Sequence, residues 1–164
     1  YNLRIVHRDL KLANFFITKG FVKIADFGFA IGEKQCMVKM DYNVGSPYYM
    51  APNTEIKLIL FPGDVWALGV IAYQLVYGRV PWKDKDDHVL YDMIMGCPIE
   101  RLFDSDKQVS DQYKKFIKNC LMIDEDSELL LNLLLTISGH SLNNMLKAYR
   151  IIIHIGLKET RCPG

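Results

Sequence analysis

Four polar residues near the start of the chain have the types and the spacing that phosphate chemistry requires. Asp9 and Asn14 lie five residues apart in the stretch HRDLKLAN, and Lys11 stands between them. Asp26 follows in the tripeptide DFG. Carboxylate and amide oxygens are suitable ligands for a hard cation such as Mg²⁺, and a lysine supplies positive charge for a phosphoryl group. Together these side chains would suit a magnesium ion and a polyphosphate.

The segments around these residues predict a β-hairpin that would bring them together. NFFIT (14–18) and FVKIA (21–25) are short runs rich in strand-forming residues, and a Lys-Gly pair typical of a tight turn separates them. Because a hairpin brings the outer ends of its strands together, Asn14 and Asp26 would converge. Asp9, on the loop that enters the first strand, would join them.

The rest of the chain predicts one long loop followed by helices. Residues 29–48 show no sustained period and end in GSP, which favours a loop. Residues 64–77 are apolar on every side, as in a buried helix, and Gly78 follows where a C-terminal cap would stand. Further helices are predicted over 82–95, after a cap at Ser110, and over 127–135. The predicted fold class is therefore α+β, mostly α.

The composition is that of an ordinary globular domain and argues against several classes of protein. The chain has 164 residues and a formal charge of +1, which gives no field that would collect nucleic acid or a membrane surface. Its apolar runs fall short of the roughly 18–20 residues that a membrane span needs. The four cysteines lie far apart without a CxxC pair, which favours free thiols over zinc or disulfides (Cys36, Cys97, Cys120 and Cys162).

Several motifs in a fixed order resemble those of the eukaryotic protein kinases. HRDLKLAN (7–14) matches the family's catalytic loop, H-R-D-L-K-x-x-N, at every specified position, and DFG follows at the usual distance. GSPYYMAP (45–52) resembles the substrate-docking end of the activation segment, and DVWALG (64–69) resembles the D-x-W-x-x-G helix. No glycine-rich loop and no V-A-I-K lysine accompany them. The resemblance therefore implies a protein-kinase-like C-terminal lobe with a small β-hairpin, lacking the N-terminal lobe.

This resemblance implies a role for each polar residue. Asp9 would accept or orient the proton of the substrate hydroxyl, and Lys11 would neutralise the migrating phosphoryl group. Asn14 and Asp26 would hold the two magnesium ions that bridge the phosphates of ATP, so the implied cofactors are ATP and Mg²⁺. Phe16 would lie under the adenine.

It also implies supporting roles and a substrate class. His7 and Phe27 would stack in the hydrophobic spine, and Asp64 would tie the backbone of the catalytic loop to the buried helix. Lys11, where most tyrosine kinases have alanine, implies serine/threonine substrates. Ser46 in GSP agrees, and it would contact Asp9 and Lys11. GSPYYMAP and KLAN further resemble the unc-51-like and calcium/calmodulin-dependent kinase groups.

Two functions remain open from the sequence. The first is a serine/threonine protein kinase that transfers the γ-phosphate of ATP to protein hydroxyls. The second is a catalytically inactive truncated kinase or pseudokinase that acts as a protein-interaction module. The second is favoured by the missing lobe and by two departures from the family pattern: A-P-E ends in Asn53, and Glu128 stands where the arginine that pairs with that glutamate is expected.

The resemblance also sets the expected domain organisation. Residues 1–138 would form a partial protein kinase domain, and residues 139–164 would form a tail without an assignment. Free cysteines and the kinase resemblance predict a cytoplasmic location. The expected partners are protein substrates, without nucleic acid or a membrane span, and the motifs identify no regulatory partner.

Overall fold

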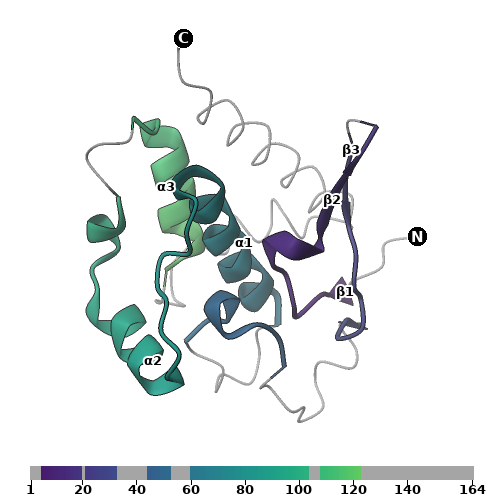
Figure 1. Cartoon of the computed structure of the whole chain (residues 1–164), viewed down its shortest axis with the longest axis horizontal. Coiled ribbons are helices and arrows are strands. Elements are labelled where there is room, and N and C mark those ends of the chain that lie inside the picture. The colour runs from purple at the N-terminus through teal and green to yellow at the C-terminus, as the bar shows by residue number, and fades with distance from the viewer. Residues whose placement is uncertain (1–4, 20, 33–43, 53–59, 104–107, 123–164) are drawn as a thin grey trace.

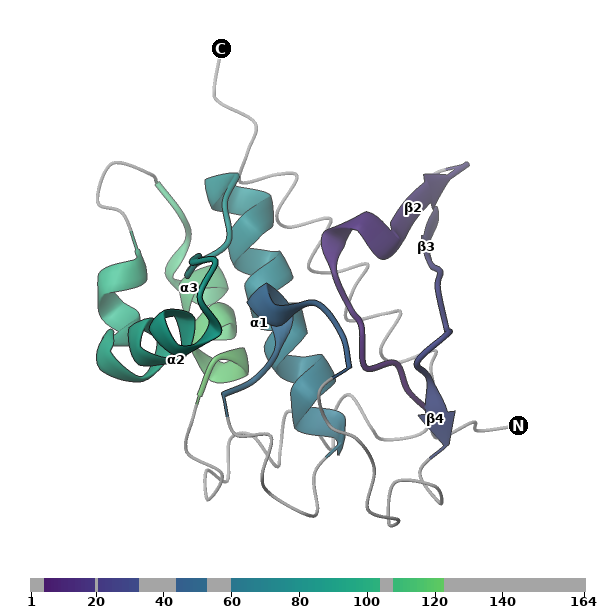
Figure 2. The same cartoon turned by 60° about the horizontal axis from the view of Figure 1, so that its bottom comes forward.

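Three α-helices and two small sheets make up the part of the chain that the computed structural model describes, which comprises residues 5–19, 21–32, 44–52, 60–103 and 108–122. The helices are α1 (Leu60–Tyr77), α2 (Asp87–Gly96) and α3 (Asp111–Cys120). In Figure 1 and Figure 2 the strands lie on one side of α1, whereas α2 and α3 lie on the other. Within these residues the architecture agrees with the predicted α+β class. Short 3₁₀ turns cover Leu12–Asn14, Pro47–Tyr49 and Ile99–Leu102.

The predicted hairpin is present. Strand β2 (Phe15–Thr18) pairs antiparallel with β3 (Phe21–Ile24), and Phe15 lies opposite Ile24. Lys19 in the connecting turn has φ of 50°, in the left-handed region that tight turns use. The strands therefore begin and end next to Asn14 and Asp26, as the sequence predicted.

A second antiparallel pair was not predicted. Strand β1 (Ile5–Val6) pairs with β4 (Ile31–Gly32), which lies within the stretch that the sequence assigned to a loop. The loop prediction was wrong at these residues because strands of two residues are too short to show an alternating period. This pair holds the segment before residues 7–14 against the segment that follows DFG.

Helix α1 is the central element of the core. Its predicted burial on all sides is confirmed, since residues 70–73 are completely inaccessible to solvent. The predicted start at Asp64 was wrong, because α1 begins at Leu60 and includes a proline in its first turn, where proline is tolerated. Gly78 has φ of 72°, and its N–H donates to the carbonyl of Gln74 at 2.9 Å, which confirms the predicted glycine cap.

Helix α2 begins later than the predicted residue 82. The Oδ1 atom of Asp86 accepts hydrogen bonds from the backbone N–H groups of His88 at 2.9 Å and Val89 at 3.3 Å. These are donors that the first turn of a helix leaves without partners, so Asp86 fixes the start at Asp87. The predicted start was wrong because this capping aspartate is one of several alternating charges in KDKDD.

Helix α3 packs closely against α1. Ser110 caps it as predicted, since its side chain accepts from the backbone N–H of Tyr113. At Gly69 of α1, an added Cβ would lie 2.7 Å from the Cβ of Cys120 and 2.8 Å from Cδ2 of Leu121. Such distances are shorter than real Cβ contacts, so the absence of a side chain at Gly69 permits this approach.

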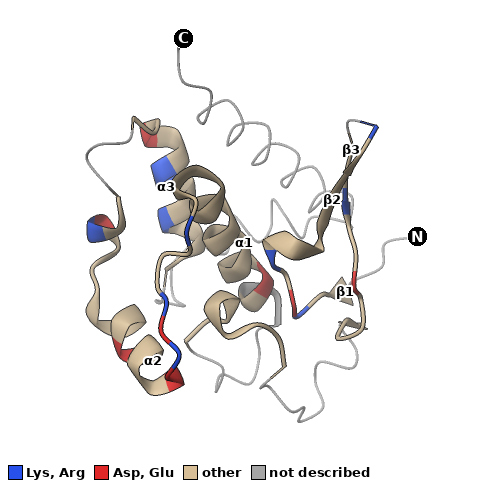
Figure 3. Cartoon of the chain, in the orientation of Figure 1, with Lys and Arg blue, Asp and Glu red and all other residues tan. Residues whose placement is uncertain are grey.

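Charged residues of both signs occur on the same elements, including α3 and the stretch before α2 (Figure 3). Among the described residues, no helix combines the length and the apolar character needed to cross a bilayer. Cys97 and Cys120 are free thiols, as predicted, while Cys36 and Cys162 lie outside the described residues. Also outside them lie the helix predicted over 127–135, the tail 139–164, and the two departures (Asn53 and Glu128).

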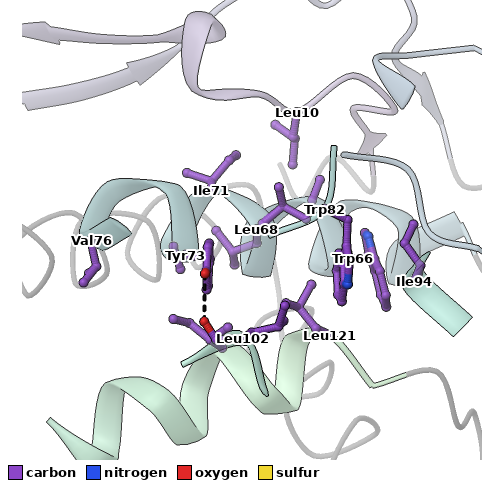
Figure 4. Close-up of a cluster of buried hydrophobic side chains, with 14 of the residues drawn as sticks. Leu10, Trp66, Leu68, Ile71, Tyr73, Val76, Trp82, Ile94, Leu102 and Leu121 are labelled. Atoms are coloured by element: carbon purple, nitrogen blue, oxygen red, sulfur yellow. Dashed lines mark hydrogen bonds between the residues drawn. The ribbon is translucent and has the colours of Figure 1, made fainter. Parts of the chain in front are cut away.

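The hydrophobic core connects α1 to residues 7–14. Figure 4 shows buried side chains from α1, α2 and the connecting segments converging, and Leu10 reaches into the same cluster. Leu10 is 1% exposed and directly follows Asp9 in the chain. The core therefore anchors the loop that carries the candidate catalytic residues.

Candidate active site

Asp9 lies at the centre of a small polar cluster with Lys11 and Ser46, here called the Asp9 cluster. Its Oδ2 accepts a hydrogen bond from Lys11 Nζ at 2.8 Å, and its Oδ1 accepts one from Ser46 Oγ at 2.9 Å. Lys11 Nζ also donates to Ser46 Oγ at 3.1 Å. The predicted contact of Ser46 with Asp9 and Lys11 is confirmed, although Ser46 is 37 residues from Asp9 along the chain.

The cluster favours the charged forms of both ionisable groups. Burial by itself raises the pKa of Asp9, but the hydrogen bonds from Lys11 and Ser46 outweigh it and leave the pKa below its ordinary value. The hydrogen bond to Asp9 in turn raises the pKa of Lys11, against a smaller opposing effect of burial. Near neutral pH the cluster therefore presents a carboxylate as a hydrogen-bond acceptor and an ammonium as a positive charge.

Asn14 and Asp26 lie beside this cluster. The Nδ2 atom of Asn14 donates to the backbone carbonyl of Asp9 at 2.9 Å, which leaves the amide oxygen for other ligands. The backbone N–H of Ala25 donates to the carbonyl of Asn14 at 2.9 Å, so Asp26 follows directly beside Asn14. Asp26 is exposed and has φ of 67°, a left-handed conformation that is uncommon for aspartate.

The donor set of Asn14 and Asp26 fits magnesium. In the part of the chain that the structure describes, no three histidine, cysteine or acidic side chains gather in a way that could enclose a metal by themselves. Mg²⁺ in phosphate-transferring sites does not need such an enclosure, because it takes one or two protein ligands and completes its shell with substrate phosphates and water. One exposed carboxylate and one free amide oxygen suit that mode of binding.

Asp64 holds the catalytic loop from α1. Its carboxylate accepts the backbone N–H of His7 at 2.7 Å and that of Arg8 at 3.0 Å. Arg8 has φ of 66°, so these bonds stabilise a strained backbone immediately before Asp9. The rings of His7 and Phe27 meet edge to face with centroids 4.8 Å apart. The predicted tie from Asp64 to the backbone of the catalytic loop is thus confirmed. His7 and Phe27 are in contact as predicted, but their rings meet edge to face rather than stacked, and their place in the hydrophobic spine stays a prediction.

Asp64 differs from Asp9 in its ionisation. Burial raises the pKa of Asp64 to about 6, and the two backbone N–H bonds oppose this only in part. No lysine or arginine side chain donates to it among the described residues. Its charge is stabilised mainly by the two backbone N–H groups, with smaller electrostatic contributions from His7 and Arg8, and this leaves it easier to protonate than Asp9.

Gly45 brings Ser46 to Asp9. It has φ of 122°, and an added Cβ would lie 2.7 Å from the carbonyl oxygen of Arg8. Only glycine combines this conformation with this close approach to a backbone. Ser46 then enters the 3₁₀ turn Pro47–Tyr49, with its hydroxyl directed at the carboxylate.

This arrangement of carboxylate, lysine, amide and DFG aspartate is accompanied by a family match. A sequence model of the protein kinase domain matches residues 1–133. The chain belongs to the protein kinase family.

Relatives of this kinase chain carry serine/threonine-kinase names, which confirms the type expected from its motifs. Examples are serine/threonine-protein kinase mph1 of Schizosaccharomyces pombe, 42% identical over 96 residues (50% of this chain, 14% of the relative); KIC1 of Saccharomyces cerevisiae, 34% over 125 residues (74% and 11%); and SKM1 of the same yeast, 34% over 140 residues (83% and 21%). The chain thus spans between 11% and 21% of the length of these kinases.

Phe16 is the residue that the resemblance assigned to the adenine. It belongs to β2 and is 54% exposed, and Ile17 and Phe21 of the same hairpin are also exposed. The structure therefore brings Asp9, Lys11, Asn14 and Asp26 into one region, while Phe16 contributes to an open apolar surface on the hairpin. Its role at the adenine stays a prediction.

Sequence reasoning did not single out a contact between the Ser46 turn and α1. Tyr49 donates its hydroxyl hydrogen to Oε1 of Gln74 at 2.7 Å. A signal was present, because Gln74 is the one strongly polar side chain in the otherwise apolar run 65–77. A polar residue inside a helix that is buried on all sides needs a hydrogen-bond partner.

Proposed function

We propose that this chain forms the catalytic half of a serine/threonine protein kinase, which transfers the γ-phosphate of ATP to serine or threonine hydroxyls of proteins. The observation that carries the proposal is the Asp9 cluster beside Asn14 and Asp26. An ionised acceptor, a fixed ammonium and two oxygen ligands for Mg²⁺ are the groups that phosphoryl transfer needs.

Each side chain has a definite task in this proposal. Asp9 accepts a hydrogen bond from the substrate hydroxyl and orients its oxygen for attack, in the way it already accepts one from Ser46 Oγ. The ammonium of Lys11 stabilises the negative charge of the migrating group. Asn14 and Asp26 hold magnesium, and ATP when bound supplies the phosphoryl group. No covalent intermediate with the protein is required.

The finer assignments belong to the same proposal. Residues 1–138 form the C-terminal lobe of the kinase domain, and 139–164 form a tail without an assigned role. The 164 residues contain no glycine-rich phosphate loop, so an N-terminal lobe is needed to cover ATP, with Phe16 under the adenine. The exposed apolar hairpin agrees with such a cover. A cytoplasmic location and the unc-51-like or calcium/calmodulin-dependent grouping stay predictions.

A second function is favoured by Asn53 and Glu128. In active kinases the residues at these positions pair as glutamate and arginine, whereas here neither partner of that ion pair is present. A chain altered in this way could serve as an inactive module that binds other proteins. The intact set Asp9, Asn14 and Asp26 supports the enzyme over the module.

The test joins this chain to a complete N-terminal lobe and measures transfer of radiolabelled phosphate to a generic serine peptide. The joined protein should phosphorylate the peptide in the presence of Mg²⁺, and Asp26→Asn should abolish the reaction. The chain of 164 residues alone should transfer none, because its sequence contains no glycine-rich loop to cover the phosphates and exclude water. A joined protein that binds Mg²⁺ and ATP yet transfers no phosphate would support the inactive module.

A further inference from the structure

Helix α2 exposes large apolar side chains over most of its surface. Its buried residues are Leu90 and Ile94, on one side of the helix. Elsewhere on the helix, four large apolar residues are between 39% and 45% exposed: Val89, Tyr91, Met93 and Met95. Because contiguous exposed apolar surface marks sites of interaction, α2 is a candidate binding surface.

These four side chains form two rows along the helix. Residues four apart lie one above the other on a helix surface. Val89 and Met93 therefore form one apolar row, and Tyr91 and Met95 form a second.

A polar row separates the two apolar rows. It consists of His88, Asp92 and Gly96, which also follow one another at intervals of four residues, and all three are exposed. A Cβ added to Gly96 would meet no atom within 4 Å, so the surface is open at this end of the row. Asp92 therefore lies at the centre of the exposed face, with apolar side chains on both sides.

The charge of this face is negative and has no counterion. Helix α2 contains the aspartates Asp87 and Asp92 but no lysine or arginine. Within the part of the chain that the structure describes, no basic side chain forms an ion pair with Asp92. A partner that covered both apolar rows would remove Asp92 from water, and an unpaired buried carboxylate is costly. The partner therefore needs a basic side chain between its own apolar side chains.

We propose that this exposed face of α2, here called the α2 face, binds an amphipathic helix of another protein. Apolar side chains of that helix cover the two apolar rows, and a lysine or arginine between them pairs with Asp92. Rows of side chains on one helix pack between rows on another, and methionine side chains adapt to the shape of a partner. In Figure 1 and Figure 2, α2 and the hairpin lie on opposite sides of α1. The proposal is therefore independent of the proposed kinase function.

Charge argues against two other occupants of the α2 face. A second copy of this chain, placed symmetrically over the face, would bring Asp92 close to its own counterpart, and like charges repel. An anionic membrane would meet the same repulsion, since helices that lie on such membranes carry lysine and arginine on their polar side. A basic amphipathic helix of another protein avoids both costs.

The first experiment measures binding of the 164-residue chain to two fluorescent helical peptides by fluorescence anisotropy. Both peptides carry two leucine rows over roughly five turns, and the row between them contains lysine in one peptide and glutamate in the other. The wild-type chain should bind the lysine peptide more tightly, by roughly three- to tenfold, and Asp92→Lys should reverse this preference. Asp111→Lys is the matched control, because it makes the same charge change at an exposed residue of α3, and it should keep the preference. Equal binding of both peptides by the wild-type chain would overturn the proposal.

A second comparison locates the bound peptide. Met95→Ala should weaken binding of the lysine peptide about fivefold, whereas Ile17→Ala should leave it unchanged, although Ile17 on the hairpin is 66% exposed. The bound peptide should also slow oxidation of Met93 and Met95 by hydrogen peroxide, measured by mass spectrometry, but not that of the half-buried Met50 outside α2. A loss of binding with Ile17→Ala alone would overturn the proposal. Binding of the chain to phosphatidylserine vesicles, or a dimer in analytical ultracentrifugation, would also overturn it if Met95→Ala abolished that association.

Discussion

The α1–α3 contact and the Asp9 cluster are both largely hidden from solvent, yet different interactions hold them. At the first, Gly69 lies close against Cys120 and Leu121, and one buried hydrogen bond, from the Tyr113 hydroxyl to the carbonyl of Ala72 at 3.0 Å, joins the same two helices. At the second, the residue Asp9 is 5% exposed, and its carboxylate is held by an ammonium and a hydroxyl. The first gains its stability mainly from close apolar packing, whereas the second offsets the cost of a buried charge with hydrogen bonds.

The two regions also differ in their backbone conformation. In the described part of the helical region the conformations are regular, and the one left-handed residue is the cap glycine Gly78. Around the Asp9 cluster, Arg8 and Asp26 are left-handed, and Gly45 has φ of 122°. Such strain persists only where neighbouring structure holds it, and it is concentrated at functional sites. The helices therefore provide the stability that the loops use to keep reactive groups in place.

Asp64 connects the two regions and shows how the loop around Asp9 depends on the helices. It belongs to α1, but its carboxylate accepts hydrogen bonds from the loop, at His7 and Arg8. Tyr49 and Gln74 make a second connection of the same kind. We expect changes in the helical contact to lower the free energy of unfolding, and changes in the cluster to lower activity.

The largest expected effect is on activity and comes from Asp9→Asn. In the kinase completed by an N-terminal lobe, this variant should lose about 100- to 10,000-fold in kcat, because the amide cannot act as the acceptor for the substrate proton. Its free energy of unfolding should change by less than about 1 kcal/mol, because the partner Lys11 is partly exposed and can reach water. Steady-state kinetics and a urea melt on the same preparation measure both quantities. A large loss of stability with little loss of kcat would mean that the Asp9 cluster serves stability and not activity.

The second effect is a difference in pH dependence between the two buried aspartates. A pKa of about 6 for Asp64, in place of roughly 4 when unfolded, means that the folded state binds this proton more tightly. The corresponding stabilisation, about 3 kcal/mol, is complete below about pH 4 and is lost as the pH rises through about 6. The pKa of Asp9 is lowered, so its contribution has the opposite sign and is lost as the pH falls below about 4.

Urea melts of the wild-type chain and Asp64→Asn between pH 4 and pH 7 separate these contributions. The variant has no carboxylate at position 64, so the difference in free energy between the two proteins should change in favour of the variant as the pH rises. The difference should be flat above about pH 7, where Asp64 is ionised. A pH-independent difference would show that Asp64 is no harder to ionise in the folded state than in the unfolded one.

How much of this could be read from the sequence differs between the two regions. The burial of α1 was predicted because 64–77 is apolar on every side, and the hairpin because two strand-like runs flank a turn. The pairing of β1 with β4 was missed because two-residue strands leave little periodic signal, and the start of α2 because its capping Asp86 lies among alternating charges. The start of α1 was missed because Pro62 and Gly63, residues typical of turns, precede Asp64. The contact of Ser46 with Asp9 came from resemblance alone, because no local pattern joins residues 37 positions apart.

The third effect tests the helical contact. Gly69→Ala should destabilise the chain by about 1–3 kcal/mol, the range for overpacking a filled core, since the new methyl group would overlap Cys120 and Leu121. Gly63→Ala is the matched control in the same helix, because a Cβ there meets no atom within 4 Å. It should be neutral or stabilising by up to about 1 kcal/mol, as expected when alanine replaces glycine in a helix. Equal urea midpoints for the two variants would mean that α3 can move away from α1 without cost.

The smallest effect concerns an ion pair on the surface, and it sharpens the contrast with the Asp9 cluster. Lys118 Nζ lies 3.2 Å from Oε1 of Glu100, and the exposed fractions of their side chains are 37% and 67%. The same two charge types meet at Asp9, where the carboxylate side chain is 4% exposed. Water and salt screen the exposed pair, and ordering two long side chains offsets much of its attraction.

Glu100→Gln should therefore leave the urea midpoint unchanged within error, at low and at high salt alike. Lys118→Met gives a useful comparison, because it also removes the ammonium that lies 5.5 Å from the centre of the Phe103 ring. If Glu100→Gln lowers the midpoint at low salt and the loss disappears at high salt, the surface pair contributes to stability. In that case the burial of the Asp9 cluster would not by itself distinguish it from the surface pair. Another property would then have to explain why strained residues and Gly45 surround Asp9 and not Glu100.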